Sequence, residues 1–314
     1  MNPILSDILH IIAYTTLVLF GHRIFLGFYK IFYVYLFSKP KNLKKLSGGA
    51  NWAIITGSSD GLGKAYANEL AKNGFNLVLI SRTLSKLENV KNEINEKYPE
   101  IEVKIIAFDF GKFSFKDYEK DIFPILDKLD IGILVNNVGQ MHKYPDYFHL
   151  FLGGPEKVAE LVTVNTLPCT ILTSKILSKM VERKSGIIIN ISSASGYHEM
   201  AKWSIYSGTK RFIKHFSACL HKEYSSLGIT IQAVCPMFLA TNMTHYSVTK
   251  TILSPEALAE SAIKTLGHTS ETAGSIIHEI QAIGLSFPSF FVDPFISILS
   301  KTQKQKILEQ QKIK

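Results

Sequence analysis

The chain has 314 residues, which is more than a single domain of common size requires, and its formal net charge is +9. Four lysines within residues 39–45, and a C-terminal segment 301–314 with five lysines and one glutamate, carry most of this charge, which leaves a net charge of +1 elsewhere. A nucleic-acid-binding fold carries a basic patch on the domain itself, so we expect no nucleic-acid partner. The three cysteines lack close spacing and the ten histidines lack a metal-ligand pattern, so neither a disulfide framework nor a metal site is predicted.

Residues 4–37 are rich in Ile, Leu, Phe and Tyr and form the first element expected along the chain. The pair His22 and Arg23 divides them into halves, neither of which reaches the ~20 residues of a straight membrane-spanning helix. Three arrangements stay open: one long tilted helix with Arg23 and Lys30 reaching the interface, a re-entrant hairpin, or a helix lying in the interface. Each predicts membrane association rather than a soluble arm, because no amphipathic partner is evident for this apolar surface.

Six short apolar runs then alternate with helix-length segments. This alternation predicts an α/β fold, a Rossmann-type doubly wound parallel sheet that forms a single domain over residues 46–275. A hydrophobic anchor with its basic flank (1–45) precedes this domain, and an apolar stretch with a basic tail (276–314) follows it. Ligands of such sheets bind beyond the carboxyl ends of the strands. The six runs are Trp52–Ile55, Asn76–Ile80, Val103–Phe108, Ile131–Val135, Gly186–Ile191 and Ile229–Val234.

A glycine-rich turn, Thr56–Gly63, connects the first run to a segment with helical spacing. Its glycines follow a G-x3-G-x-G spacing, which does not fit a nucleoside-triphosphate loop. Glycines here allow backbone angles closed to other residues and let a pyrophosphate approach the main chain near a helix N-terminus. The turn therefore predicts a dinucleotide site, the alternative being an ordinary glycine-rich turn.

A second motif, Tyr206 with Lys210, follows Ser193 in the chain. A tyrosine one helical turn before a lysine lies on the same helix face. The ammonium is expected to lower the tyrosine pKa from its reference near ~10. Tyr206 then acts as an acid–base group, and Ser193 hydrogen-bonds the substrate oxygen as charge develops on it.

Together these motifs resemble the short-chain dehydrogenase/reductase family over roughly residues 50–274. Thr56–Gly63 matches the family's cofactor turn, and Asn136–Gly139 matches its N-N-A-G segment with Val138 in place of alanine. The family's catalytic tetrad, in which the asparagine supports a proton relay through the lysine, is matched by Asn165, Ser193, Tyr206 and Lys210. The resemblance implies cofactor contacts from Gly57, Ser58, Ser59, Gly61, Leu62, Gly63, Asn137, Tyr206 and Lys210.

The choice between the two nicotinamide cofactors depends on the end of the second run. An NAD enzyme usually carries a carboxylate there for the ribose 2′-hydroxyl. This chain has Arg82 instead, which can pair with a 2′-phosphate, so we predict NADP(H); the alternative is a solvated surface arginine. Asp109, after the third run, resembles the family's adenine-contacting acid.

Two apolar segments after Pro236 bear on the substrate. Residues 237–254 lack clear periodicity and are expected to form a mobile lid, whose Met237 and Phe238 make it apolar. The phenylalanine-rich stretch Ile276–Leu299 forms either a second membrane contact or a cover for the substrate channel. An apolar pocket beside a membrane predicts a lipidic substrate.

Within the family, the anchor, the glycine turn and the segment Cys235–Met243 resemble the branch of 17-beta-hydroxysteroid dehydrogenases and very-long-chain 3-oxoacyl-CoA reductases. The resemblance implies an endoplasmic reticulum membrane enzyme whose catalytic domain faces the cytosol, as the basic flank also predicts for a spanning anchor. It would reduce a 17-ketosteroid or a 3-oxoacyl-CoA with NADPH, using Tyr206 as proton donor; a homodimer stays open. The competing hypothesis is a catalytically silent, membrane-tethered binding or scaffold protein, which would need neither Tyr206 nor Lys210.

Overall fold

The computed structural model describes residues 3–244 and 246–312, apart from the side chains of Arg23, Lys30, Lys306 and residues 310–312. It divides into two compact units, Met1–Lys39 and Pro40–Lys314.

The N-terminal unit is one continuous helix. It starts as α1 (Pro3–Phe28) and continues as the π-helical η1 (Tyr29–Phe37). The helix runs through His22, so of the three arrangements the re-entrant hairpin is not the one observed. At 35 residues and about 50 Å it is long and apolar enough to cross a membrane. The interfacial placement expected for the Arg23 and Lys30 side chains lies outside the described residues.

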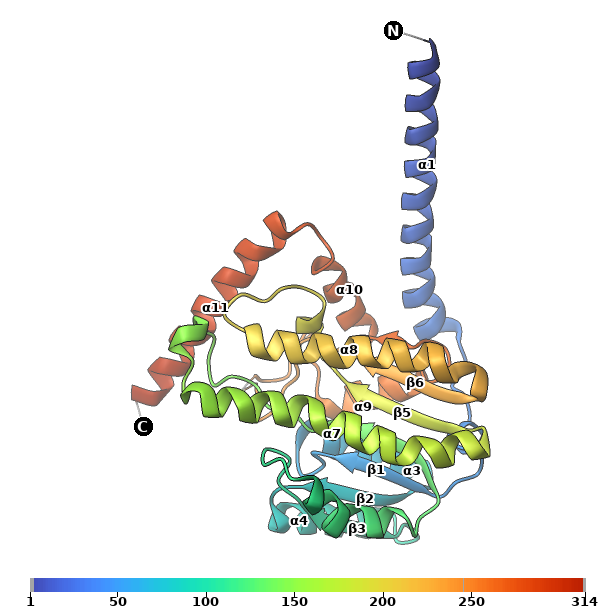
Figure 1. Ribbon diagram of the computed structural model, residues 1–314, viewed down its shortest axis with the longest axis vertical. Coiled ribbons are helices and arrows are strands. Elements are labelled where there is room, and N and C mark those ends of the chain that lie inside the picture. Colours follow the sequence, from blue (N-terminus) through green and yellow to red (C-terminus); the bar gives the residue numbers. More distant parts are fainter. Residues whose placement is uncertain (1–2, 245, 313–314) are drawn as a thin grey trace. The chain divides into compact units, whose positions relative to one another are not determined.

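The second unit contains a seven-stranded sheet in the order β3-β2-β1-β4-β5-β6-β7 (Figure 1), and every neighbouring pair is parallel. The six predicted strands are confirmed within a residue or two at each end. The seventh strand was not predicted from the sequence, because it is only two polar residues long. The strands are β1 Trp52–Thr56, β2 Asn76–Ser81, β3 Val103–Ala107, β4 Ile131–Asn136, β5 Gly186–Ile191, β6 Ile229–Val234 and β7 Glu271–Thr272.

Helices cover both faces of the sheet, as a doubly wound fold requires. Successive side chains of a strand point to opposite faces, so Ile55 of β1 joins the core under α3 and α9, whereas Ile54 joins the core under α7. The long helices are α3 Gly61–Lys72, α4 Leu84–Lys97, α7 Gly154–Arg183, α8 Ser204–Tyr224, α9 Pro255–Lys264, α10 Ile276–Gly284 and α11 Ser289–Lys312. The short ones are α2 Leu43–Leu46, α5 Phe115–Asp117, η2 Tyr118–Ile122, α6 Phe123–Leu126, η3 Phe148–Leu150, η4 Ala194–Gly196 and η5 Ser225–Leu227.

The strand order reverses between β1 and β4, and this is the point at which such sheets open a crevice for ligands. The turn after β1, the loop after β4 and the segments after β5 and β6 all meet there.

The C-terminal helices α10 and α11 belong to the same unit as the sheet and meet at an angle of 112°. Three polar contacts tie α11 to the catalytic fold. His198 Nε2 lies 2.7 Å from Asp293 Oδ1, and Lys304 Nζ lies 2.7 Å from an oxygen of Asp146. Gln303 also donates a hydrogen bond to the hydroxyl of Tyr246. These contacts join α11 to three residues that lie far from it in the sequence.

Candidate active site

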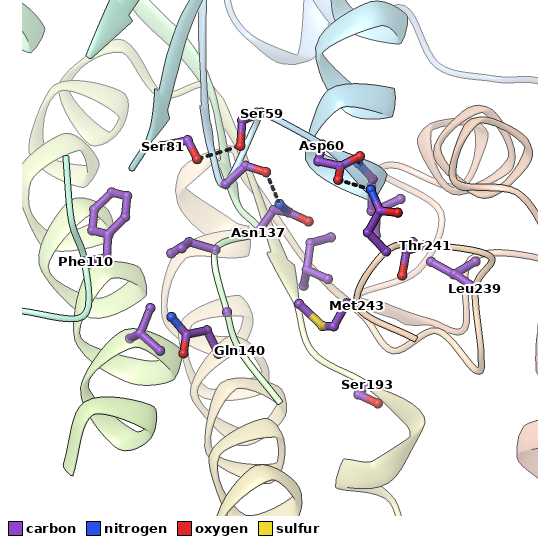
Figure 2. Close-up of a pocket in the computed structure, with 18 of the residues that line it drawn as sticks. Ser59, Asp60, Ser81, Phe110, Asn137, Gln140, Ser193, Leu239, Thr241 and Met243 are labelled. Atoms are coloured by element: carbon purple, nitrogen blue, oxygen red, sulfur yellow. Dashed lines mark hydrogen bonds between the residues drawn. The ribbon is translucent and has the colours of Figure 1, made fainter. Parts of the chain in front are cut away.

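A cavity of about 340 Å³ lies at the carboxyl ends of the strands, and Figure 2 shows many of the side chains around it. Ser59 and Ser81 face one another at one end, whereas Ser193 lies at the other. Of the residues predicted from the sequence, the cavity is lined by Gly57, Ser59, Gly61, Leu62, Arg82, Asp109, Asn137, Ser193, Tyr206 and Lys210.

The glycine turn at the start of α3 has the backbone shape that its sequence predicts. Gly57 and Gly61 have φ of 64° and 52°, in the region that favours glycine. A Cβ on Gly63 would lie 2.2 Å from the carbonyl oxygen of Gly57, so this residue must also be small. Gly63 and the fully buried Ser58 lie behind the turn rather than on the cavity wall. The open face therefore presents main chain at a helix N-terminus, which fits the pyrophosphate of a dinucleotide.

Asn137 holds this turn against the end of β4. Its Nδ2 donates to the carbonyl oxygens of Thr56 at 2.9 Å and Gly57 at 3.1 Å. The Thr56 hydroxyl in turn accepts from the backbone N–H groups of Asn137 and Val138. The segment after β4 thus fixes the glycine turn. Asn137, which was predicted to contact the cofactor, therefore also positions the turn.

The end of β2 forms the far wall of the cavity. Ser81 Oγ lies 2.8 Å from Ser59 Oγ, and the exposed Arg82 follows it at the rim. Asp109 accepts a hydrogen bond from the backbone N–H of Gly111 at 3.0 Å and also lines the cavity. The wall offers hydroxyls and a guanidinium, which suit a ribose carrying a 2′-phosphate.

The four tetrad residues come together from three separate segments: α7, the chain after β5, and α8, which carries both Tyr206 and Lys210. Lys210 Nζ donates to the carbonyl oxygen of Ile191 at 3.0 Å and lies 5.7 Å from the centre of the Tyr206 ring. Ser193 hydrogen-bonds Tyr206 and accepts from the backbone N–H of Ser195.

The Asn165 carboxamide pairs with the backbone of Gln140. Its Oδ1 accepts from Gln140 N–H at 2.7 Å, and its Nδ2 donates to the Gln140 carbonyl at 3.0 Å and to Thr209 Oγ1 at 3.0 Å. A Cβ on Gly139 would lie 3.1 Å from Asn165 Oδ1 and 3.4 Å from Lys210 Nζ. Asn165 thus ties α7, α8 and the loop after β4 into one arrangement beside the lysine.

Burial sets the protonation of the tyrosine and the lysine. It raises the pKa of Tyr206, and the hydrogen bond with Ser193 opposes this rise only in part. The prediction that Lys210 lowers the Tyr206 pKa is therefore wrong for this structure: the ammonium is directed to Ile191, and desolvation outweighs the remaining effects. Burial also lowers the pKa of Lys210 to about 8, against the raising effect of the buried Cys169 and Cys235 thiols. Tyr206 thus holds its proton at neutral pH, as a proton donor must.

One residue beside the tyrosine was not found from the sequence. His142 Nε2 accepts a hydrogen bond from the backbone N–H of Tyr206 at 3.3 Å, and its ring packs against Trp203. Burial lowers the pKa of His142 to about 4, although a backbone hydrogen bond with Lys202 opposes this, so the ring is neutral and can accept. No sequence pattern singles out His142 from the other histidines, because 64 residues separate it from Tyr206.

A second cavity of about 730 Å³ adjoins the first and shares Ser193, Tyr206 and Pro236 with it. Its walls are largely apolar and come from the segment after β6, from α10 and from α11. The predicted lid residues Met237 and Phe238 line it. Tyr206 and Ser193 thus stand between a polar cavity at the glycine turn and an apolar one under the C-terminal helices.

This architecture, with a glycine turn after β1 and a Ser, Tyr and Lys set at the ends of β5 and on α8, defines a dinucleotide-dependent oxidoreductase fold. Residues 51–251 match the short chain dehydrogenase family, and the chain belongs to the short-chain dehydrogenase/reductase family.

Its relatives span nearly its whole length. A Caenorhabditis elegans protein named "Putative steroid dehydrogenase 3" is 44% identical over 283 residues, 90% of this chain and 89% of the relative. The very-long-chain 3-oxoacyl-CoA reductase of the same organism is 43% identical over 92% of this chain and 91% of its own length. Among solved structures, a short-chain dehydrogenase from Sphingobium yanoikuyae in complex with NADPH matches with a TM-score of 0.61 and 28% identity, over 68% of this chain and 83% of that chain.

Proposed function

We propose that the protein is an NADPH-dependent reductase of a ketone on a lipidic substrate, either a 17-ketosteroid or a 3-oxoacyl-CoA. The observation that carries the proposal is the meeting of two cavities at Tyr206 and Ser193. One cavity has the glycine turn of a dinucleotide site, and the other, at about 730 Å³, has the size and apolar lining of a site for a large hydrophobic ligand.

The polar cavity would hold NADPH, which supplies the hydride when bound. Gly57 and Gly61 would bring main-chain N–H groups to the pyrophosphate, and Arg82 would pair with the 2′-phosphate. The relative from Sphingobium yanoikuyae, which binds NADPH, supports this choice of cofactor. Lys210 and Tyr206 would contact the ribose and nicotinamide side of the cavity, which Val138 also lines.

The ketone oxygen would bind between Tyr206 and Ser193. During the reduction, negative charge would develop on this oxygen, and the two hydroxyls would stabilise it by hydrogen bonds. Tyr206 would give its proton to the oxygen, so that the ketone, with one hydride and one proton added, becomes an alcohol. Lys210, with Asn165 beside it, would return a proton to the phenolate that remains.

The membrane placement follows from the N-terminal unit. A 35-residue apolar helix precedes the basic residues 39–45, and such a flank lies on the cytosolic side of a spanning helix. We therefore propose that the catalytic unit faces the cytosol, and the resemblance to the branch of 17-beta-hydroxysteroid dehydrogenases and very-long-chain 3-oxoacyl-CoA reductases supports the endoplasmic reticulum as the membrane. The names of its relatives, a steroid dehydrogenase and a very-long-chain 3-oxoacyl-CoA reductase, support a lipidic substrate at that site.

The test is NADPH oxidation by the full-length protein in detergent, with a 3-oxoacyl-CoA and a 17-ketosteroid offered in parallel. We expect turnover of one of them and a loss of about 10²-fold or more in Tyr206→Phe, which keeps the ring and removes only the hydroxyl. Tight NADPH binding without turnover of either ketone would instead favour the silent scaffold, and full turnover by Tyr206→Phe would refute the role of the tyrosine.

A further inference from the structure

The C-terminal elbow, which we define as residues 276–299, exposes an unusual amount of apolar surface. It comprises α10, a break at residues 285–288 and the first half of α11, and its helices meet at 112° (Figure 1). From Ile280 to Val292 it has no charged residue. The exposed large apolar side chains of the elbow are Ile277, Ile280, Ile283, Phe287, Phe290, Phe291, Phe295 and Ile298, of which Phe290 is 70% exposed.

Both acidic groups of the elbow, Glu279 and Asp293, contact the catalytic fold. Glu279 is buried and accepts hydrogen bonds from the hydroxyl of Thr272 and the backbone N–H of Ala273. Asp293 is paired with His198 at 2.7 Å. The elbow is therefore fixed to the fold through these two groups, and apart from Asp293, whose side chain is 60% exposed, its large exposed side chains are apolar.

The outer surface is continuous with the lining of the apolar cavity. Phe287, Phe291 and Phe295 all line that cavity, yet each is more than half exposed. Side chains that line a cavity and are also exposed to solvent lie at its mouth. The apolar cavity thus opens at the elbow, and Tyr206 and Ser193 line the same cavity.

A bilayer is the surface that this elbow fits best. Exposed apolar patches of this kind mark interaction sites, and the same chain carries a helix long and apolar enough to anchor it to a membrane. The helices α10 and α11 satisfy their own backbone hydrogen bonds, as a segment in contact with lipid must. By length and composition, the two helices together could also form a broken membrane span or a re-entrant loop. Lysines follow the elbow from Lys301 onward, where headgroups would meet it.

We propose that the elbow inserts into the lipid bilayer and forms the mouth through which an apolar substrate passes from the membrane to Tyr206 without crossing water. The access route rests on the proposed reductase function, whereas the membrane contact does not.

The membrane contact is tested with the full-length protein in phosphatidylcholine vesicles that contain anionic lipid, with or without bromine on the acyl chains. Phe290→Trp reports on the tip of the elbow, and Leu227→Trp, an exposed position in η5 before β6, is the matched control. The native Trp52 and Trp203 are buried and give the background, which the wild type measures. We expect brominated lipid to quench the added fluorescence of Phe290→Trp and to leave that of Leu227→Trp unchanged. Equal quenching in both variants overturns the proposal. A tryptophan in Phe290→Trp that is buried but not quenched also overturns it, because a protein partner or a second copy of the chain would then cover the elbow.

The access route is tested with Phe290→Glu, since Phe290 does not line either cavity. In vesicles we expect kcat/KM to fall about tenfold for a long-chain, membrane-dissolved ketone and to stay unchanged for a short, water-soluble 3-oxoacyl-CoA. The control Leu227→Glu should affect neither substrate. Equal losses on both substrates, or no loss on the long one, would refute the route. A wild type that reduces no ketone would refute the proposed function instead, and the quenching result would still decide the membrane contact.

Discussion

Lys210 is the side chain whose replacement has the most specific consequences for both stability and activity. It is buried in the fold, and burial lowers its pKa from 10.5 to about 8. At pH 7 the folded protein therefore holds a desolvated ammonium. A difference of about 2.5 pKa units corresponds to an unfavourable contribution of about 3 kcal/mol, at about 1.4 kcal/mol per unit.

The variant Lys210→Met removes this contribution and keeps an unbranched apolar side chain in the space. It also loses the hydrogen bond to the carbonyl oxygen of Ile191, worth about 1 kcal/mol. We therefore expect the variant to be more stable than the wild type by about 2 kcal/mol at pH 7, and to raise Tm by about 4 °C. Turnover should fall by about 10²-fold or more, since the group beside Tyr206 is gone.

The pH dependence has a definite sign. Between pH 8 and pH 10.5 the unfolded lysine still binds its proton while the folded one has released it, so the stability of the wild type rises with pH in this window. The advantage of the variant is thus constant below pH 8 and shrinks by about 3 kcal/mol toward pH 10.5, where the wild type becomes the more stable protein.

Thermal unfolding of both proteins in the same detergent from pH 7 to pH 10.5 measures this difference, because other titrating groups cancel between them. Lys222→Met, an exposed position on the same helix α8, is the control and should follow the wild type at every pH. A Lys210→Met protein that melts below the wild type at pH 7, or whose difference from it does not change with pH, would refute the reasoning.

Three further changes test the cofactor cavity and the C-terminal cover. Gly63→Ala places a methyl group 2.2 Å from the Gly57 carbonyl oxygen, so we expect NADPH affinity to fall by about tenfold or more in a fluorescence titration; an unchanged Kd would contradict the close approach. Arg82→Ala should weaken NADPH binding by about 10- to 100-fold and NADH binding by less than about twofold, and equal losses would remove the 2′-phosphate contact. His198→Ala leaves Asp293 without its 2.7 Å partner, and amide hydrogen exchange in α11 should then become faster while that in β5 does not change; unchanged exchange in α11 would mean that apolar packing alone holds the helix.

Six strands were predictable because each is a short, mainly apolar run of a parallel sheet, and all but the edge strand β3 are almost completely buried. The strand β7 was not, since Glu271 and Thr272 are polar and pair with β6 only because the chain after α9 returns to the sheet edge. The gathering of Gly57, Asn137 and Ser193 in one crevice could be inferred from strand ends alone. Local sequence patterns were therefore sufficient to predict the six main strands and the residues that gather at their carboxyl ends.

What the sequence could not supply depends on packing between distant segments. The Tyr206 pKa was predicted from one neighbour, whereas in the structure desolvation raises this pKa and Lys210 is directed to Ile191. The pair His198 and Asp293 is separated by 95 residues, so the placement of α11 over the apolar cavity had no local signal. Electrostatic environment and long-range cover are properties of the folded chain, and short motifs do not encode them.

The central claim is that the protein transfers a hydride from NADPH to a ketone held at Tyr206 and Ser193. The most direct measurement supplies the full-length protein with NADPH that carries deuterium at both C4 positions and with a long-chain 3-oxoacyl-CoA or a 17-ketosteroid, and analyses the product by mass spectrometry. We expect an alcohol with one deuterium on the carbinol carbon, formed by the wild type and lost in Tyr206→Phe. An alcohol without deuterium, or equal product from Tyr206→Phe, would contradict the claim.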